Sequence, residues 1–166
     1  MKKLLGLLTL VCLLFFSAIS DASAAINNKY ELRVAADKVS EIARYDVLSF
    51  VNKNELIGYM LDNFNLRAMD YQRVAQYHAE NMYGYITQIE IIENSVDFSD
   101  TEKEMKCRQF YQYADTSLAD LNSKTISYLV GLRDMMPTIT YQRYVKRFLD
   151  YYNELNLTET DIRIRN

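Results

Sequence analysis

The sequence predicts an all-α protein, an up-down bundle of about four helices with a long central antiparallel hairpin. The 166 residues include one proline and four glycines, so few positions would break a helix. Along two long segments, apolar residues recur at alternating steps of three and four, which is the repeat of one helix face. Runs of alternating polarity, which would indicate strands, are few. Helix is therefore the expected structure for most of the mature chain.

Residues 1–24 have the pattern of a cleaved secretory signal peptide. Lys2-Lys3 precedes an apolar run over positions 4–19, and Ala22-Ser23-Ala24 provides the small residues that signal peptidase reads. The run is shorter than the roughly 20 apolar residues that span a bilayer. We therefore expect cleavage before Ala25, a periplasmic or secreted mature protein, and no stable membrane insertion after cleavage.

The mature chain is mildly acidic and contains a single cysteine. Without residues 1–24 it has 17 basic and 21 acidic side chains, a net charge of −4, and no long basic cluster. Nucleic-acid binders usually carry a basic face, so we expect no nucleic-acid partner. Cys107 has no intramolecular disulfide partner and is expected to be a small buried hydrophobe. An intermolecular disulfide stays open, as does a homodimer that shares the core.

The first half of the mature chain contains two predicted helices. A weaker apolar stripe over 32–47 stops at Asn52-Lys53-Asn54. A second stripe, over 61–92, keeps its spacing throughout, and Asn63-Phe64-Asn65 is the place where that helix could be interrupted. The second stripe predicts the first long helix of the central hairpin.

A short break separates the two long helices. The pattern stops over 94–100, where Ser99 with Glu102 has the spacing of a capping box, and Asp100 is a second candidate cap. The stripe then resumes over 107–135 and predicts the second long helix. Because the connection is short, the two long helices should be antiparallel neighbours.

The last predicted helix begins near the single proline. Pro137 suits the first turn of a helix whose apolar stripe extends to Leu155. Residues 158–166 are polar and are expected to form a loosely held tail. The expected organisation is a signal peptide over 1–24, a helical bundle domain over 25–157 and this tail.

The hairpin prediction also fixes which side chains face each other. For a turn near residues 96–98, the numbers of facing residues sum to about 195. His78, the only histidine, then lies opposite Ser117, and Tyr71 lies near Thr125. Because His78 is on the apolar stripe, its default role is a hydrogen-bonded core side chain. We expect these four residues to be buried and to fix the helix register through hydrogen bonds.

The sequence contains no reliable signature of catalysis, of a metal centre or of a cofactor site. Ser117 has no glycine-rich elbow or oxyanion-forming turn around it. Cys107 is expected opposite Gln88, about 15 Å of helix from His78, which disfavours a Cys-His dyad. One histidine cannot form the paired Glu-x-x-His motif of helical metal centres. We expect no enzyme, metal ion or cofactor, and a haem held by His78 and a methionine is the weaker alternative.

Two acidic residues, Glu90 and Glu93, lie one turn apart beside the apolar stripe. They are expected on a solvated face, paired with Lys103 or Lys106 across the hairpin.

Tyrosine is the unusual component of the composition, with fourteen copies and no tryptophan. Tyr59, Tyr77, Tyr83 and Tyr113 lie off the apolar stripes and should project from the flanks of the bundle. Because tyrosine is enriched at protein interfaces, these four are the candidate partner-binding residues. The alternative is that they pack against the first and last helices.

The general form of the mature chain is similar to that of several small periplasmic classes. These include immunity proteins that neutralise peptidoglycan-attacking effectors. The similarity covers size, export and helicity, and the single mature cysteine departs from the disulfide-bearing helical immunity families. It therefore implies no functional residue.

Three functional hypotheses follow from these observations. The first is an exported non-enzymatic protein that binds a protein partner in the envelope, most concretely an immunity-type inhibitor of a toxic effector. The second is a periplasmic structural or chaperone-like adaptor that binds many clients weakly. The third is a secreted virulence or host-directed factor. A tight one-to-one complex would favour the first, broad micromolar binding the second, and presence in culture supernatant the third.

Overall fold

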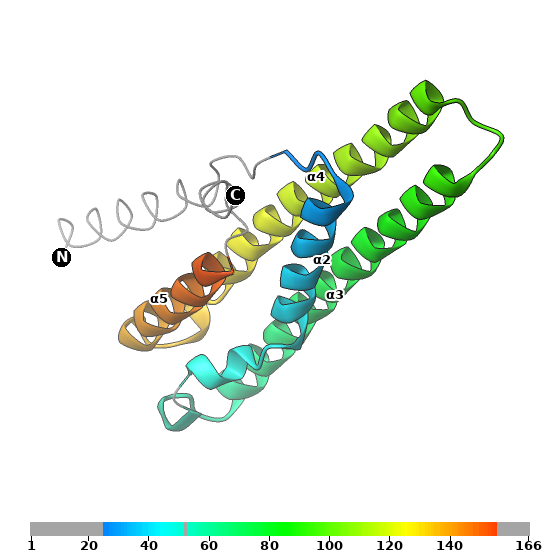
Figure 1. The fold of residues 1–166 in the computed structure, drawn as a ribbon. Helices are drawn as coiled ribbons and strands as arrows, with labels where there is room; N and C mark the ends of the chain where they lie inside the picture. The colour runs from blue at the N-terminus through cyan, green and yellow to red at the C-terminus, as the bar shows by residue number, and fades with distance from the viewer. Residues whose placement is uncertain (1–24, 52, 156–166) are drawn as a thin grey trace.

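The computed structural model describes residues 25–51 and 53–155 (Figure 1). Within them the chain forms four α-helices and no strand, which confirms the predicted all-α bundle. The elements are α2 (Lys29–Arg44), η1 (Val47–Phe50), η2 (Lys53–Glu55), α3 (Tyr59–Asn94), α4 (Asp100–Gly131), η3 (Arg133–Met135) and α5 (Thr138–Glu154), where η marks a short 3₁₀ helix. The predicted signal peptide and the predicted polar tail lie outside the described residues.

Consecutive α-helices run in opposite directions. The Tyr83 hydroxyl of α3 donates to Asp37 of α2 at 2.7 Å, and the Gln72 amide of α3 donates to the Tyr45 carbonyl at 2.6 Å. Residue numbers therefore rise along α2 as they fall along the facing part of α3. Residues 95–99 join α3 to α4, which lies beside it in the opposite direction (Figure 1).

The last helix, α5, returns along α4. The hydroxyl oxygens of Tyr128 and Tyr144 are 2.7 Å apart, and the Tyr152 hydroxyl donates to Asn122 at 2.5 Å. The later residue of α5 thus meets the earlier residue of α4, so these two helices are also antiparallel.

The short helices α2 and α5 cover successive lengths of the α3–α4 hairpin (Figure 1). α2 packs beside residues 72–93 of α3, whereas α5 contacts Phe64 and Tyr71, nearer the start of that helix. The two short helices meet where the rings of Tyr45 and Tyr151 stack, with centroids 4.0 Å apart. Their 16 and 17 residues together nearly match the 36 residues of α3. Most cross-sections therefore contain three helices, although the bundle has four.

Different side chains hold the two short helices on the hairpin. Against α5, the Phe64 ring meets Tyr144 edge-on at 5.2 Å, and Tyr71 meets Phe148 at 5.7 Å. Buried alanines fill the interface with α2: Ala35, Ala36, Ala75 and Ala79. Rings hold helix axes apart, whereas alanines allow close approach. None of the described helices is long and apolar enough to cross a membrane.

Local sequence sets the start of three helices. The Asn28 side chain accepts from the Glu31 N–H at 2.9 Å and caps α2. Ser99 and Glu102 form the full capping box of α4, which confirms the predicted cap. Gly58 precedes α3 with a φ of +49°, a conformation that L side chains rarely adopt.

Two features of α3 and α5 differ from the prediction. α3 is continuous through the possible break at Asn63-Phe64-Asn65, because the Phe64 ring is only 1% exposed and packs on Tyr144. Burial of that ring outweighs the weak helix propensity of two asparagines. Pro137 is the N-cap residue of α5, one position before the predicted first turn.

The first predicted helix also ends early. α2 stops at Arg44, because Tyr45 is extended and the Asp46 side chain accepts from the Leu48 N–H. Val47, the last residue of the predicted stripe, is nevertheless buried in η1. The apolar spacing therefore predicted correctly that Val47 is buried, but α2 does not continue to it.

Candidate functional site

Three side chains form a polar relay at the middle of the α3–α4 hairpin. His78 Nδ1 lies 2.7 Å from Ser117 Oγ, and His78 Nε2 lies 3.2 Å from Asp120 Oδ2. The histidine is 5% exposed and the serine 8%, whereas Asp120 reaches solvent. The structure thus places His78 beside Ser117, where the register predicted it. Asp120, which is one turn beyond Ser117 on α4, had no recognisable signature in the sequence.

The hydrogen bonds of the relay have a fixed direction. A carboxylate can only accept, so Nε2 of His78 donates to Asp120 and Nδ1 accepts from the Ser117 hydroxyl. Burial lowers the pKa of His78 below its usual value of 6.5, although Asp120 acts in the opposite direction. The neutral imidazole is therefore the form that the fold favours.

This relay has the residue types of a serine hydrolase but not its surroundings. Ser117 is buried inside α4, whose interior N–H groups are used in helix hydrogen bonds, so no pair of backbone donors faces its oxygen. Neither of the two grooves described below is lined by Ser117 or His78. The relay can hold α3 and α4 in register.

A second buried contact joins the hairpin at the predicted pair Tyr71 and Thr125. Their hydroxyl oxygens are 2.9 Å apart, and the Thr125 hydroxyl also donates to the Leu121 carbonyl at 2.8 Å. Tyr71 is 3% exposed and Thr125 is fully buried. Burial raises the pKa of Tyr71 well above 10.0, so this phenol stays protonated and can donate.

The other reactive residues considered in the sequence do not form a common site. Cys107 is buried, and this burial raises the pKa of its thiol, which disfavours the reactive thiolate. Among the described residues, no three His, Cys, Asp or Glu side chains converge in a way that could hold a metal ion.

The four candidate partner-binding tyrosines are all exposed but do not form one patch. Tyr59 and Tyr77 are 71% and 62% exposed, on the outer face of α3. Tyr83 is tied to Asp37 of α2, about 36 Å of helix from Tyr59. Tyr113 lies on α4 beside the rings of Tyr85 and Phe110. These positions separate the four hydroxyls onto different parts of the surface.

The end of the hairpin is a feature that the sequence analysis did not single out. We call residues 90–106 the hairpin tip; Figure 1 shows the turn that joins α3 to α4 projecting past the start of α2. It contains six carboxylate and two ammonium side chains, a net charge of −4, and the other described residues have thirteen of each sign. Its exposed apolar side chains are Ile91, Val96 and Met105, at 58%, 95% and 64%. The charge count was available from the sequence, but the exposure of the apolar residues required the fold.

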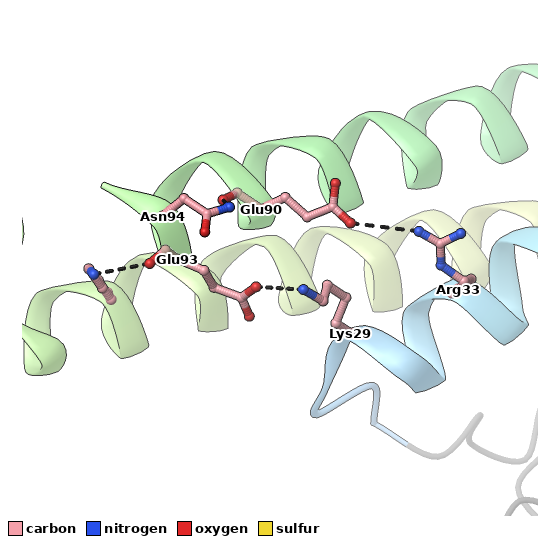
Figure 2. Close-up of polar contacts among 6 residues, drawn as sticks. Lys29, Arg33, Glu90, Glu93 and Asn94 are labelled. Carbon is pink, nitrogen blue, oxygen red and sulfur yellow. Dashed lines mark hydrogen bonds and ion pairs between the residues drawn. The ribbon is translucent and has the colours of Figure 1, made fainter. Parts of the chain in front are cut away.

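Two of the tip carboxylates fasten α2 to α3 (Figure 2). Lys29 Nζ contacts Glu93 at 2.5 Å, and Arg33 lies 3.7 Å from Glu90. The predicted pairing of these carboxylates with Lys103 or Lys106 across the hairpin is therefore wrong. The cause is that α2 brings its own cations to this face of α3.

The two lysines that were predicted to pair with these carboxylates have other contacts. Lys103 donates to the main-chain carbonyl of Glu93 at 3.0 Å, and the Lys106 ammonium lies 4.6 Å from the centre of the Phe98 ring. Four tip carboxylates make no ion pair with another described residue: Asp97, Asp100, Glu102 and Glu104, of which Glu102 accepts hydrogen bonds from Ser99. The tip thus keeps free negative charge beside exposed apolar side chains.

Two grooves lie on the surface of the hairpin. One, of about 790 Å³, is lined by Ala25, Ile26, Cys107 and neighbouring residues of α4. The Ile26 N–H donates to Asp115 at 2.9 Å, so the start of the described chain is held against α4. The other, of about 520 Å³, lies between α3 and α4 at the opposite end of the hairpin from the tip.

No protein-family model, no curated protein and no solved structure matches the chain.

Proposed function

We propose that the mature chain is an exported non-enzymatic protein that binds a protein partner in the cell envelope through its hairpin tip. Its most concrete form is an immunity-type inhibitor of a toxic effector. The observation that supports this proposal best is the concentration of charge at the tip, where residues 90–106 have a net charge of −4 and the other described residues are neutral in sum. The leader pattern of residues 1–24 supports the envelope as the compartment.

The tip combines the two elements of a protein-binding surface. Val96, Ile91 and Met105 provide exposed apolar contacts that could become buried anchors. Asp97 and Glu104 provide a negative rim, which would steer a basic partner and accelerate its association. A projecting turn can also enter a concave site. A basic cleft, such as the active site of an enzyme that binds an acidic polymer, is the partner surface that fits this tip.

The polar relay supports a role other than catalysis. Its serine is buried and lines neither of the two grooves described above, and its histidine is favoured in the neutral form between two hydrogen bonds. Without a catalytic role, the relay serves to hold α3 and α4, the two helices that carry the tip, in register.

The first experiment is site-specific photocrosslinking in the cells that make the protein. A photoreactive amino acid replaces Val96 in one full-length variant, and Tyr77 or Tyr113 in two others. A single abundant protein crosslinked from position 96 alone, and identified by mass spectrometry, is the expected result. Crosslinks from Tyr77 or Tyr113 but not from Val96 would overturn the tip proposal and favour the tyrosine interface. Many weak products would favour the adaptor, and none would favour a protein that acts outside the cell.

Binding of the purified partner then measures the contribution of charge. The double change Asp97→Asn and Glu104→Gln should lower the association rate about tenfold at low salt, and the difference should shrink as salt screens the charges. Asp62→Asn with Asp134→Asn is the matched control, since it removes the same charge from the other end of the hairpin. Equal effects of the two pairs would mean that net charge, rather than the tip, attracts the partner.

A further inference from the structure

A groove between α3 and α4 lies on the face of the hairpin that neither short helix covers. We call it the hairpin groove; its volume is about 520 Å³, within the range of roughly 300–1,000 Å³ that small-molecule sites have. Its lining comes from α3, α4 and η3, and neither α2 nor α5 contributes a residue. About 20 residues of α3, or about 30 Å of helix, separate the groove from the hairpin tip.

The floor of the hairpin groove is apolar and held in place. The rings of Tyr71 and Tyr128 stack with centroids 4.5 Å apart and planes inclined by 9°. Both hydroxyls are bonded inside the bundle, Tyr71 to Thr125 and Tyr128 to Tyr144, so the rings cannot turn them towards the groove. The half-buried side chains of Val74 and Met135 extend this apolar lining.

Two cations stand at the groove, one from each helix. Arg67 of α3 and Lys124 of α4 both line it, and neither makes an ion pair with another described residue. Gly131 leaves room for the Arg67 side chain, because a Cβ built at position 131 would be 3.2 Å from Arg67 Nη1. Asp70 also lines the groove, but its carboxylate is 3.2 Å from Arg73.

We propose that the hairpin groove binds a small amphipathic carboxylate. Arg67 and Lys124 would bind the carboxylate group, and Val74, Tyr128 and Met135 would contact its apolar body. A guanidinium can hold a carboxylate through two parallel hydrogen bonds, and the ammonium adds a second charge from the facing helix. A cationic amphiphile would meet these two like charges, and an uncharged one would leave both without a counter-ion. The groove therefore selects for negative charge on an apolar molecule.

Solution NMR of the mature chain with three matched ligands tests this proposal. Decanoate, decanol and decyltrimethylammonium have the same alkyl chain and differ in charge, and each is added below its micelle-forming concentration. Decanoate should shift the methyl signals of Val74 and Met135 and leave those of Ile91 and Val96 at the tip unchanged. Equal binding of decanol would overturn the proposal, because the cations would then contribute nothing.

Variants of the two cations locate the charge contact. Arg67→Gln and Lys124→Gln should each weaken decanoate binding about fivefold, as expected for an exposed ion pair of about 1 kcal/mol. Arg133→Gln is the matched control, because it removes the same charge near the same end of the hairpin but does not line the groove. A loss in the control that equals the loss in the two variants would show that general electrostatics, not the groove, attracts decanoate.

A final arm separates a free carboxylate from an anionic lipid surface. The mature chain is mixed with vesicles of phosphatidylcholine, with and without phosphatidylglycerol, and sedimented. The proposal expects the chain to stay in the supernatant in both cases while decanoate still binds. Sedimentation with the anionic vesicles that is lost in Arg67→Gln would overturn the free ligand in favour of a lipid headgroup.

Discussion

His78 Nδ1 accepts a hydrogen bond from Ser117 Oγ across 2.7 Å, and this contact sets the register of the two longest helices. Both groups are buried, so neither can exchange its partner for water. A slip of one turn between α3 and α4 would leave an unpaired imidazole nitrogen and an unpaired hydroxyl in the core, and each unpaired group costs about 1–3 kcal/mol.

Removal of either hydroxyl that faces α3 should therefore destabilise the bundle. Thr125→Val leaves the Tyr71 hydroxyl without its partner, and Ser117→Ala does the same to His78 Nδ1. We expect each to lower the free energy of unfolding by about 1–2 kcal/mol in urea titrations. Thr116→Val is the control, because Thr116 makes the same hydrogen bond to the carbonyl four residues earlier but is exposed. Neutral results for both buried variants would show that these contacts do not set the register.

Acid should weaken the fold through His78. Burial holds the pKa of this side chain below the value of 6.5 that it has in the unfolded chain, so the unfolded state binds the proton more readily. The free energy of unfolding should consequently fall as the pH drops below about 6.5 and stop falling below the folded-state pKa. Urea titrations of the native protein and of His78→Gln at pH 7.5 and 5.5 measure this loss. A loss of the same size in both proteins would contradict the assignment to His78.

The sequence predicted contacts within the hairpin better than contacts with the other helices. Two long stripes and a short connection leave one register, so the facing pairs at His78 and Tyr71 followed from residue numbers alone. The same rule gave the wrong partners for Glu90 and Glu93, because a stripe shows which side of a helix is buried but not which helix covers it. Lys29 and Arg33 of α2 could be placed there only by the fold.

The candidate sites were harder to predict from the sequence than the core was. The four tyrosines are exposed, as their positions off the stripes predicted, but they do not form one patch. Three of them are spread along α3, where Tyr83 is hydrogen-bonded to Asp37, and Tyr113 lies on α4. Arg67 and Lys124 had no signature, since their proximity depends on the antiparallel register and on the missing side chain at Gly131. Sites formed by two helices in this way depend on tertiary geometry, which local spacing does not contain.

The hydroxyls of Tyr128 and Tyr144 should act as a coupled pair at the interface of α4 with α5. Tyr128 and Tyr144 share a buried hydrogen bond of 2.7 Å, and burial raises the pKa of both phenols, so one donates and the other accepts. Tyr128→Phe and Tyr144→Phe should each lower the free energy of unfolding by about 1–2 kcal/mol. The double variant should lose less than the sum, because no buried hydroxyl is then left unpaired. Thermal unfolding of the native protein, the two single variants and the double variant measures this double-mutant cycle. Strictly additive losses would show that the two hydroxyls act separately.

The contact of Lys29 with Glu93 should contribute little to stability. Its side chains are 38% and 43% exposed, so water screens most of the attraction. Glu93→Gln should lower the free energy of unfolding by less than about 1 kcal/mol, and 1 M salt should abolish the difference. Glu104→Gln serves as the comparison, because Glu104 has no ion pair among the described residues. A large, salt-independent loss in Glu93→Gln would mean that the carboxylate is needed for the docking of α2.

Gly131→Ala should separate stability from ligand binding. This glycine is helical, and an alanine there should raise the free energy of unfolding by about 0.5–1 kcal/mol. The added Cβ would be 3.2 Å from Arg67 Nη1, so the guanidinium must move away from α4. Decanoate binding should therefore weaken even though the protein becomes more stable. Urea titration and methyl NMR on the same sample measure both effects, with Gly84→Ala as the control because no atom lies within 4 Å of its Cβ position. Unchanged decanoate binding in Gly131→Ala would show that the position of Arg67 is not what the carboxylate recognises.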